Sequence, residues 1–219
     1  MAFLPGLFER SRLLILDFAR IPAAAEPHED ISRFFADHED AALPHQRQRF
    51  NDRLIAASGF RYLVGRHGED RSALLSGSPM AEEGRVVHLG VDVFCTELEP
   101  VHAPCDGTVL RAGFEEQHRG YGYYLVFQPD SPSLPGFFLG HLSAEPPTIG
   151  WVRGGERIAR IGDRASGENG GWSRHLHVQA LAAPFPEGTP PGYSTVAGFP
   201  AACALHPDPM SFFPAWRLR

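Results

Sequence analysis

Two histidines separated by one leucine form the first candidate for chemistry in this sequence. His175 and His177 lie in the run RHLHVQA. Side chains alternate between the faces of a strand, so both imidazoles point to one face, while Leu176 and Val178 point to the other. A solvated strand face fits an isolated pair of this kind equally well, so other parts of the chain have to decide between the two interpretations.

A second pair of polar residues, His88 and Asp92, lies in the run RVVHLGVDVF. Its alternation predicts one strand over residues 86–94, with both side chains on the face that lacks valines. Imidazole and carboxylate groups are ligands that suit zinc. Positions four apart on a straight strand lie roughly 13 Å apart, which is too far for easy convergence on one ion. Because Gly90 permits a bulge or a bend, we expect an irregular backbone there.

A further histidine, His141, ends the apolar run GFFLGH. A catalytic zinc ion takes three protein ligands and keeps a fourth position for water. The chain therefore offers five candidate groups in its β-rich part, enough for three ligands and two groups that handle protons beside the water. Each motif alone is a weak signal, whereas their conjunction in this order is a strong one.

With these motifs in this order, residues 84–180 resemble the lysostaphin-type zinc endopeptidases, the family that includes LytM and LasA. Members carry HxxxD, a lone histidine in an HLS-like strand, and HxH. The runs VHLGVDVFCTELEPVHAPCDGTV, YGYYLVF and GWVRGGERIARIGD are similar to the surrounding strands and turns of that family. The runs NGGW and HPDP are similar to a cytosolic branch. The resemblance covers roughly half of the chain.

The resemblance implies Zn²⁺ as cofactor, with His88, Asp92 and His177 as its ligands. It places His141 and His175 beside the bound water and the substrate carbonyl. We assign His175 as the base, because it lies roughly 6–7 Å along the strand from its neighbouring ligand, too far for a second direct ligand. His141 would then orient water or stabilise the oxyanion. The sequence fits an exchange of these two roles equally well.

One residue of the family pattern is absent from this chain. Secreted members often have a tyrosine before HxxxD that stabilises the oxyanion, whereas MAEEGRVV contains none. Tyr121 or Tyr123 would have to serve instead. Asp106, in CDGTV, is expected to be a turn residue rather than a ligand. Six other histidines are expected to have surface or packing roles: His28, His38, His45, His102, His118 and His206.

The composition predicts one main β-rich domain with additions. The chain has 219 residues, of which 43% are hydrophobic, with 23 glycines and 20 prolines that favour many turns. We expect a mainly β fold, and the resemblance implies antiparallel sheets in a barrel-sandwich hybrid, with a short helical N-terminal region. Residues 1–83 would be a helical or extended elaboration, 84–182 the zinc peptidase domain, and 183–219 a tail packed on it.

Helix signals are confined to the N-terminal part. The run HQRQRFNDRLIAASG places Phe50, Leu54 and Ile55 on one stripe and predicts a helix that stops at Gly59. Asp30 is placed as the N-cap of an earlier short helix. The run RLLILDF fits either a strand or a buried helical turn.

Charge and hydropathy patterns exclude several classes of protein. The net charge is −6, and the basic residues are scattered arginines, which argues against a nucleic-acid groove. No window has the length of a membrane span, and the N-terminus lacks a long uncharged stretch, so we expect a cytoplasmic protein. Cys95, Cys105 and Cys203 lack a CxxC pair, and we interpret them as small buried apolar residues.

The sequence therefore predicts a zinc metalloendopeptidase that hydrolyses peptidoglycan-type or other small peptides. Two alternatives remain. One is a module of the same fold that binds a partner without catalysis, and the other is a zinc amidase with an unknown cytosolic substrate.

Overall fold

One large sheet organises the computed structural model, which describes residues 3–4, 13–15, 44–75, 78–117, 119–184 and 187–212. All neighbouring strands in the sheet are antiparallel except the first pair, which is parallel. In spatial order, its strands are β1 (Leu13–Ile15), β2 (Tyr62–Gly65), β4 (Val91–Phe94), β11 (His175–Leu181), β8 (Gly136–Leu142), β7 (Gly122–Pro129), β6 (Gly107–Glu115) and β9 (Gly150–Val152).

Two small antiparallel sheets accompany the large one. Strand β5 (Pro100–His102) pairs with β10 (Arg157–Arg160), and β3 (Arg85–His88) pairs with β12 (Tyr193–Thr195). The helical elements are α2 (Pro44–Ser58), α3 (Ser72–Leu75), α4 (Pro79–Glu82), α5 (Phe199–Leu205) and the 3₁₀ helix η2 (Pro209–Ser211). The expected mainly β, antiparallel fold with a short helical region near the N-terminus is confirmed.

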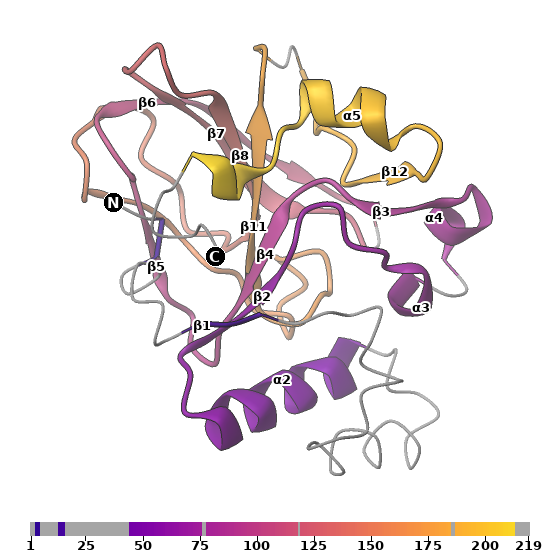
Figure 1. Cartoon of the computed structure of the whole chain (residues 1–219). Coiled ribbons are helices and arrows are strands. Elements are labelled where there is room, and N and C mark those ends of the chain that lie inside the picture. Colours follow the sequence, from indigo (N-terminus) through magenta and orange to yellow (C-terminus); the bar gives the residue numbers. More distant parts are fainter. Residues whose placement is uncertain are drawn as a thin grey trace.

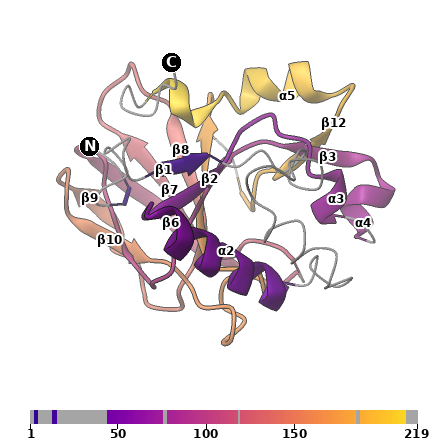
Figure 2. The ribbon, with the colours of Figure 1, turned by 60° about the horizontal axis from the view of Figure 1, so that its bottom comes forward.

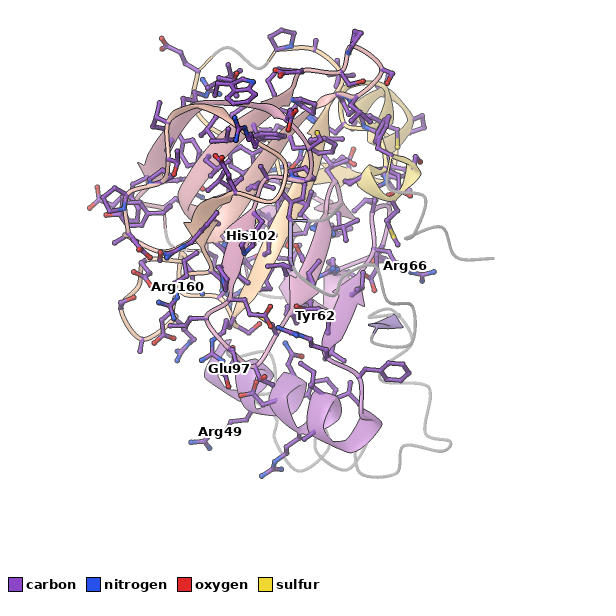
Figure 3. All side chains as sticks on the ribbon, turned by 90° about the vertical axis from the view of Figure 1, so that its left-hand side faces the viewer. Arg49, Tyr62, Arg66, Glu97, His102 and Arg160 are labelled. Carbon is purple, nitrogen blue, oxygen red and sulfur yellow. The ribbon has the colours of Figure 1, made fainter. Side chains whose placement is uncertain are left out.

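Helix α2 packs at one end of the molecule, opposite α5 (Figures 1 and 2). Its stripe of Phe50, Leu54 and Ile55 is buried as predicted, while Arg49 projects away from the rest of the molecule (Figure 3). The helix ends where the sequence predicts, because Gly59 adopts a φ of 71° and donates its N–H to the Ile55 carbonyl at 3.2 Å.

Strand β11 separates the apolar core from the polar site. Leu176, Val178 and Ala180 face the core, and the alternate residues His175 and His177 face the other way. Both faces of this strand are buried, and it lies between β4 and β8 in the sheet (Figure 1). The polar face is therefore covered by other parts of the chain and is not a solvated strand face.

The C-terminal segment supplies part of that cover. Tyr193 of β12 pairs with His88 of β3, and the Ala182 N–H donates to the Leu205 carbonyl at 2.9 Å. The large sheet in turn includes β1 and β2, which precede residue 84. The division at residues 83 and 182 stays a prediction.

Some expectations concern parts of the chain about which the structure says nothing. Asp30 and the helix expected after it, together with His28, His38 and His118, lie outside the described residues, and so does the side chain of His45. The alternative left open for RLLILDF is resolved in favour of a strand over Leu13–Ile15. Within the described ranges, no helix combines the length and the apolar character needed to cross a membrane.

Candidate metal centre

The chain changes sheets between His88 and Asp92. The expected single strand over 86–94 is wrong, because β3 ends at His88 and β4 begins at Val91, in a different sheet. The expected irregular backbone at Gly90 is confirmed, since a bend lies there. This bend overcomes the separation that a straight strand would impose, and it brings both side chains to one point.

Three ligand atoms converge at that point. His88 Nε2 lies 3.4 Å from Asp92 Oδ1 and 3.3 Å from His177 Nδ1, and Asp92 Oδ1 lies 2.9 Å from His177 Nδ1. These three residues form a group with the spacing of a metal site, and all of them are buried. Zinc bonds of 2.0–2.2 Å place ligands about 3.3 Å apart at the corners of a tetrahedron. The observed spacing therefore fits zinc.

The hydrogen bond made by one ring nitrogen of His88 decides which of its two nitrogens is unprotonated. His88 Nδ1 lies 3.1 Å from the carbonyl oxygen of Arg66. Arg71 Nη2, which only donates, lies farther from this nitrogen, at 3.4 Å. A carbonyl only accepts hydrogen bonds, so the shorter contact indicates that Nδ1 carries the proton and donates it. His88 Nε2 then presents a lone pair toward Asp92 and His177.

The unprotonated nitrogen of His177 is identified in the same way, from its contact with Gln179. Gln179 is fully buried on the same face of β11 as His177. The side-chain nitrogen of Gln179 donates to the Pro191 carbonyl at 3.1 Å, so its oxygen must face the imidazole. His177 Nε2 donates to that oxygen at 3.1 Å. His177 Nδ1 is consequently the unprotonated nitrogen that faces Asp92.

The arrangement leaves three lone-pair atoms facing one another without a proton between them. Protonation of His88 does not relieve this, because burial lowers its pKa to about 4 despite the nearby Asp92. A cation among these atoms satisfies all three, so the donor set fits a divalent metal.

Arg71 holds the other oxygen of the Asp92 carboxylate. Its Nη1 lies 3.3 Å from Asp92 Oδ2, and its Nε donates to Glu69 Oε2 at 3.0 Å. The Arg71 side chain is fully buried. Since Oδ2 is engaged by the guanidinium, Oδ1 is left to face the histidines. Arg71 lies in a short segment without periodicity, so the sequence pattern did not point to it.

His141 and His175 stand side by side at this cluster, with ring centroids 4.2 Å apart. His141 Nδ1 donates to the Asn169 carbonyl at 2.9 Å, and His175 Nδ1 donates to the Ser173 carbonyl at 2.6 Å. Their Nε2 atoms therefore carry lone pairs. His175 Nε2 lies 3.6 Å from Asp92 Oδ1. Burial lowers the pKa of both imidazoles, so both remain neutral at neutral pH.

The backbone at His141 is strained. Its φ of 63° lies in the left-handed region, which costs a non-glycine residue on the order of 1–3 kcal/mol. Two hydrogen bonds hold it there, because its N–H donates to the Tyr121 carbonyl and its carbonyl accepts from the Gly162 N–H, both at 2.9 Å. This conformation turns the end of β8 so that the imidazole reaches His175.

A cavity of about 320 Å³ opens at the five residues that the sequence singled out, and His141, His175, His177 and Asp92 line it directly. Tyr121 also lines the cavity, but its hydroxyl already donates to Gln179 Oε1 at 3.2 Å.

Tyr123 is not among the residues that line this cavity, and its ring packs on Phe114 instead, with centroids 4.6 Å apart. The expectation that one of these two tyrosines stabilises an oxyanion stays a prediction.

Tyr193 is the second tyrosine that lines this cavity, and no sequence pattern pointed to it. Its ring centroid lies 5.5 Å from that of His88. Burial raises the pKa of its phenol, which keeps the hydroxyl protonated and able to donate. The run GYST in a proline-rich segment gave no sign of this role, because only the pairing of β12 with β3 brings it here.

Other candidates lie away from the cavity. His102 Nδ1 faces the Gly155 carbonyl at 2.9 Å, and Asp106 accepts a hydrogen bond from the Gly154 N–H at 2.8 Å, as a turn residue does. Cys95 is buried as expected, whereas Cys105 and Cys203 are only partly buried.

No protein-family model matches the sequence, and no curated protein matches it. Several solved structures, in contrast, are similar to this chain. The catalytic domain of the antimicrobial peptidase lysostaphin from Staphylococcus simulans is 23% identical, over 58% of this chain and 79% of that chain, with a TM-score of 0.42. Whole lysostaphin is 22% identical over 71% of this chain and 50% of its own, with a TM-score of 0.46.

A zinc-containing peptidase from Vibrio cholerae is 28% identical over 44% of this chain and 27% of that chain, with a TM-score of 0.35. The match to whole lysostaphin, in contrast to that to its catalytic domain, covers only half of the length of that protein. In fold, this chain is similar to the lysostaphin-type peptidases.

Proposed function

We propose that this protein is a zinc-dependent hydrolase of peptide bonds. One observation carries the proposal. The lone-pair atoms of His88, Asp92 and His177 converge within 2.9–3.4 Å of one another, at a cavity that two further unprotonated imidazole nitrogens border. Three protein ligands with room for a reactant are the arrangement of a catalytic zinc site rather than a structural one.

A zinc ion held by these residues would act as a Lewis acid and would lower the pKa of its bound water to about 7. His175 accepts the proton that the attacking water loses, at Nε2, the nitrogen that the hydrogen bond of Nδ1 to the Ser173 carbonyl leaves free. It then delivers this proton to the leaving amine. His141, oriented in the same way by Asn169, positions the attacking water or the substrate carbonyl.

Tyr193 donates a hydrogen bond from its hydroxyl to the developing oxyanion. Its position in the cavity wall beside His88 and its raised pKa support this role. Tyr121 acts differently, since its hydroxyl is engaged by Gln179 and so helps to hold His177.

The proposed substrates are peptidoglycan-type fragments or other small peptides. The experiment incubates zinc-loaded protein with peptidoglycan fragments and glycine-rich peptides and reads the products by mass, with zinc content measured by emission spectroscopy. We expect one zinc ion per chain and cleavage of a peptide bond. The His102→Ala variant, which removes a histidine outside the cavity, should behave as the wild type.

The other outcomes identify the alternatives. Purified protein that binds no zinc would contradict the proposed zinc-dependent hydrolysis. Stoichiometric zinc with no cleavage of any substrate would favour a binding module, and cleavage of the amide between sugar and peptide would favour an amidase.

A further inference from the structure

Arg119 is a cation at the cavity that the proposed mechanism does not use. It lies in the loop between β6 and β7, and its φ of 61° is in the left-handed region that non-glycine residues rarely adopt. Its N–H donates to the Gly170 carbonyl at 3.2 Å, which helps to hold this conformation. Strained residues of this kind concentrate at functional sites.

The guanidinium of Arg119 is positioned by an aromatic ring. Its Cζ lies 5.7 Å from the centroid of the Trp172 ring, and both residues line the cavity. A cation over an indole face is attracted by the ring and loses part of its freedom. Among the ion pairs of the described residues, none involves Arg119.

The other two arginines at the cavity already have carboxylate partners. Arg71 is bound to Asp92 and Glu69, and Arg85 is bound to Glu83 at 2.6 Å. Their positive charges are therefore balanced within the protein.

Glu115, the acidic side chain at the cavity besides Asp92, also has hydrogen-bond partners within the protein. The carboxylate of Glu115 accepts one hydrogen bond from the backbone N–H of Tyr121 and one from the hydroxyl of Thr189. Of the charged side chains that line the cavity, Arg119 is thus the one without an ion-pair or hydrogen-bond partner among the described residues.

We propose that Arg119 binds a carboxylate of the substrate. The protein then selects peptides with a free carboxylate within one or two residues of the bond that is cut. The planar guanidinium matches a carboxylate with two parallel hydrogen bonds. The cavity of about 320 Å³ is at the small end of ligand cavities, roughly 300–1,000 Å³, so this carboxylate must lie close to the reacting carbonyl. The proposal rests on the proposed peptide hydrolysis.

Two sources supply such a carboxylate, the C-terminus of a peptide and an acidic side chain. The test uses zinc-loaded protein and the peptides acetyl-Gly-Gly-Gly, its C-terminal amide, and acetyl-Gly-Asp-Gly amide. Binding is measured by calorimetry and by the fluorescence of tryptophan. We expect at least one carboxylate peptide to bind tenfold or more tightly than the uncharged amide, and the peptide that does so identifies the source.

Three variants assign the preference to Arg119. Arg119→Gln and Arg119→Gly remove the charge, and glycine also relieves the strained φ, so the second variant keeps the test valid if the first folds poorly. Both should bind the carboxylate and amide peptides equally. Arg49→Gln makes the same charge change on the outer face of α2 and should retain the full preference (Figure 3).

Hydrolysis of the same peptides separates this proposal from the proposed function. A preference that the Arg119 variants lose, in a protein that cuts none of the peptides, would support the carboxylate site and contradict the hydrolase. Equal binding of acid and amide by the wild type, binding of none of the peptides, or a preference that persists in both Arg119 variants would overturn the carboxylate site.

Discussion

A Cβ atom on Gly90 would lie 2.6 Å from Nε2 of His177. It would also lie 2.9 Å from the carbonyl oxygen of Val178, a backbone atom of β11. Gly90 does not have a positive φ, so the close approach of the imidazole, not the backbone conformation, requires glycine here. The residue that lets the chain pass from β3 to β4 is also the residue that leaves room for a metal ligand.

Replacing Gly90 by alanine should therefore damage the metal site. The methyl group must displace the His177 ring or move β11, and we expect zinc affinity to fall by about 10–100-fold, the range found when ligand orientation is lost. Zinc affinity is measured by competition with a chromophoric chelator. Gly136→Ala is the matched control, because its nearest obstacle is the flexible end of Gln128 at 3.0 Å. Wild-type affinity in Gly90→Ala would contradict this account.

The two histidines of the HxH motif should respond differently to removal. His177→Ala should lose zinc, because Nδ1 is one of three converging ligand atoms. His175→Ala should retain zinc and lose hydrolysis, because its Nε2 serves the proton. Emission spectroscopy on both purified variants, with activity measured in parallel, checks the assignment. Stoichiometric zinc in both variants would show that the ligands are assigned wrongly.

Gln179 should control zinc affinity without touching the metal. Gln179→Leu removes the acceptor of the His177 Nε2–H, so the imidazole is free to change tautomer or rotate, and affinity should fall by about 10–100-fold. Gln179→Glu keeps an acceptor for His177 but loses the donor to the Pro191 carbonyl, so it should retain more of the affinity than the leucine variant. Chelator competition on both variants makes the comparison, and equal affinity of the leucine variant and the wild type would rule this role out.

Tyr193→Phe tests the hydroxyl proposed for the oxyanion. The ring and its packing on His88 are kept, so zinc content should not change. Loss of one such donor lowers kcat by about 100–1,000-fold with little change in KM. Steady-state kinetics on a cleaved peptide measure both constants. A Tyr193→Phe variant with wild-type kcat would assign the oxyanion to another group. Tyr121→Phe is the comparison variant, because it removes a cavity hydroxyl that is already engaged by Gln179.

Local spacing predicts how the two histidines of the HxH motif lie. The period of two places His175 and His177 on one face, and the structure places both there, on a strand that pairs with Asp92 and reaches His141. The stop of α2 at Gly59 is likewise a local signal, and the structure confirms it.

The supporting residues could not be predicted, because they depend on contacts between distant parts of the chain. Tyr193 reaches the site through the pairing of β12 with β3, and Arg71 reaches it through an ion pair with Asp92. The division of 86–94 into two strands has the same origin. Alternation describes the two faces of a strand but does not say which sheet each half joins.

A buried hydrogen bond between two residues that do not line the cavity makes stability sensitive to alkaline pH. The hydroxyl of Tyr62 donates to Glu99 Oε2 at 2.6 Å, and Arg61 also binds this carboxylate, with Nη2 at 3.0 Å from Oε2. Burial raises the pKa of the Tyr62 phenol far above its usual value of 10, and the hydrogen bond and charge of Glu99 raise it further. The folded state therefore keeps a proton that the unfolded chain releases near pH 10.

Tyr62→Phe should change the alkaline limb of stability in a defined direction. Above pH 10 the unfolded wild type binds fewer protons than the folded one, so its free energy of unfolding falls by about 1.4 kcal/mol per pH unit from this group. The variant lacks this contribution. It should be less stable below pH 10, by about 1–3 kcal/mol for the lost hydrogen bond to a charged group, and the gap should close as the pH rises. Urea unfolding at several pH values between 8 and 11.5 measures the difference.

Burial also raises the pKa of Cys95, but this residue is present in both proteins and cancels from the comparison. A gap that stays constant across this pH range would show that Tyr62 ionises alike in the folded and unfolded chains.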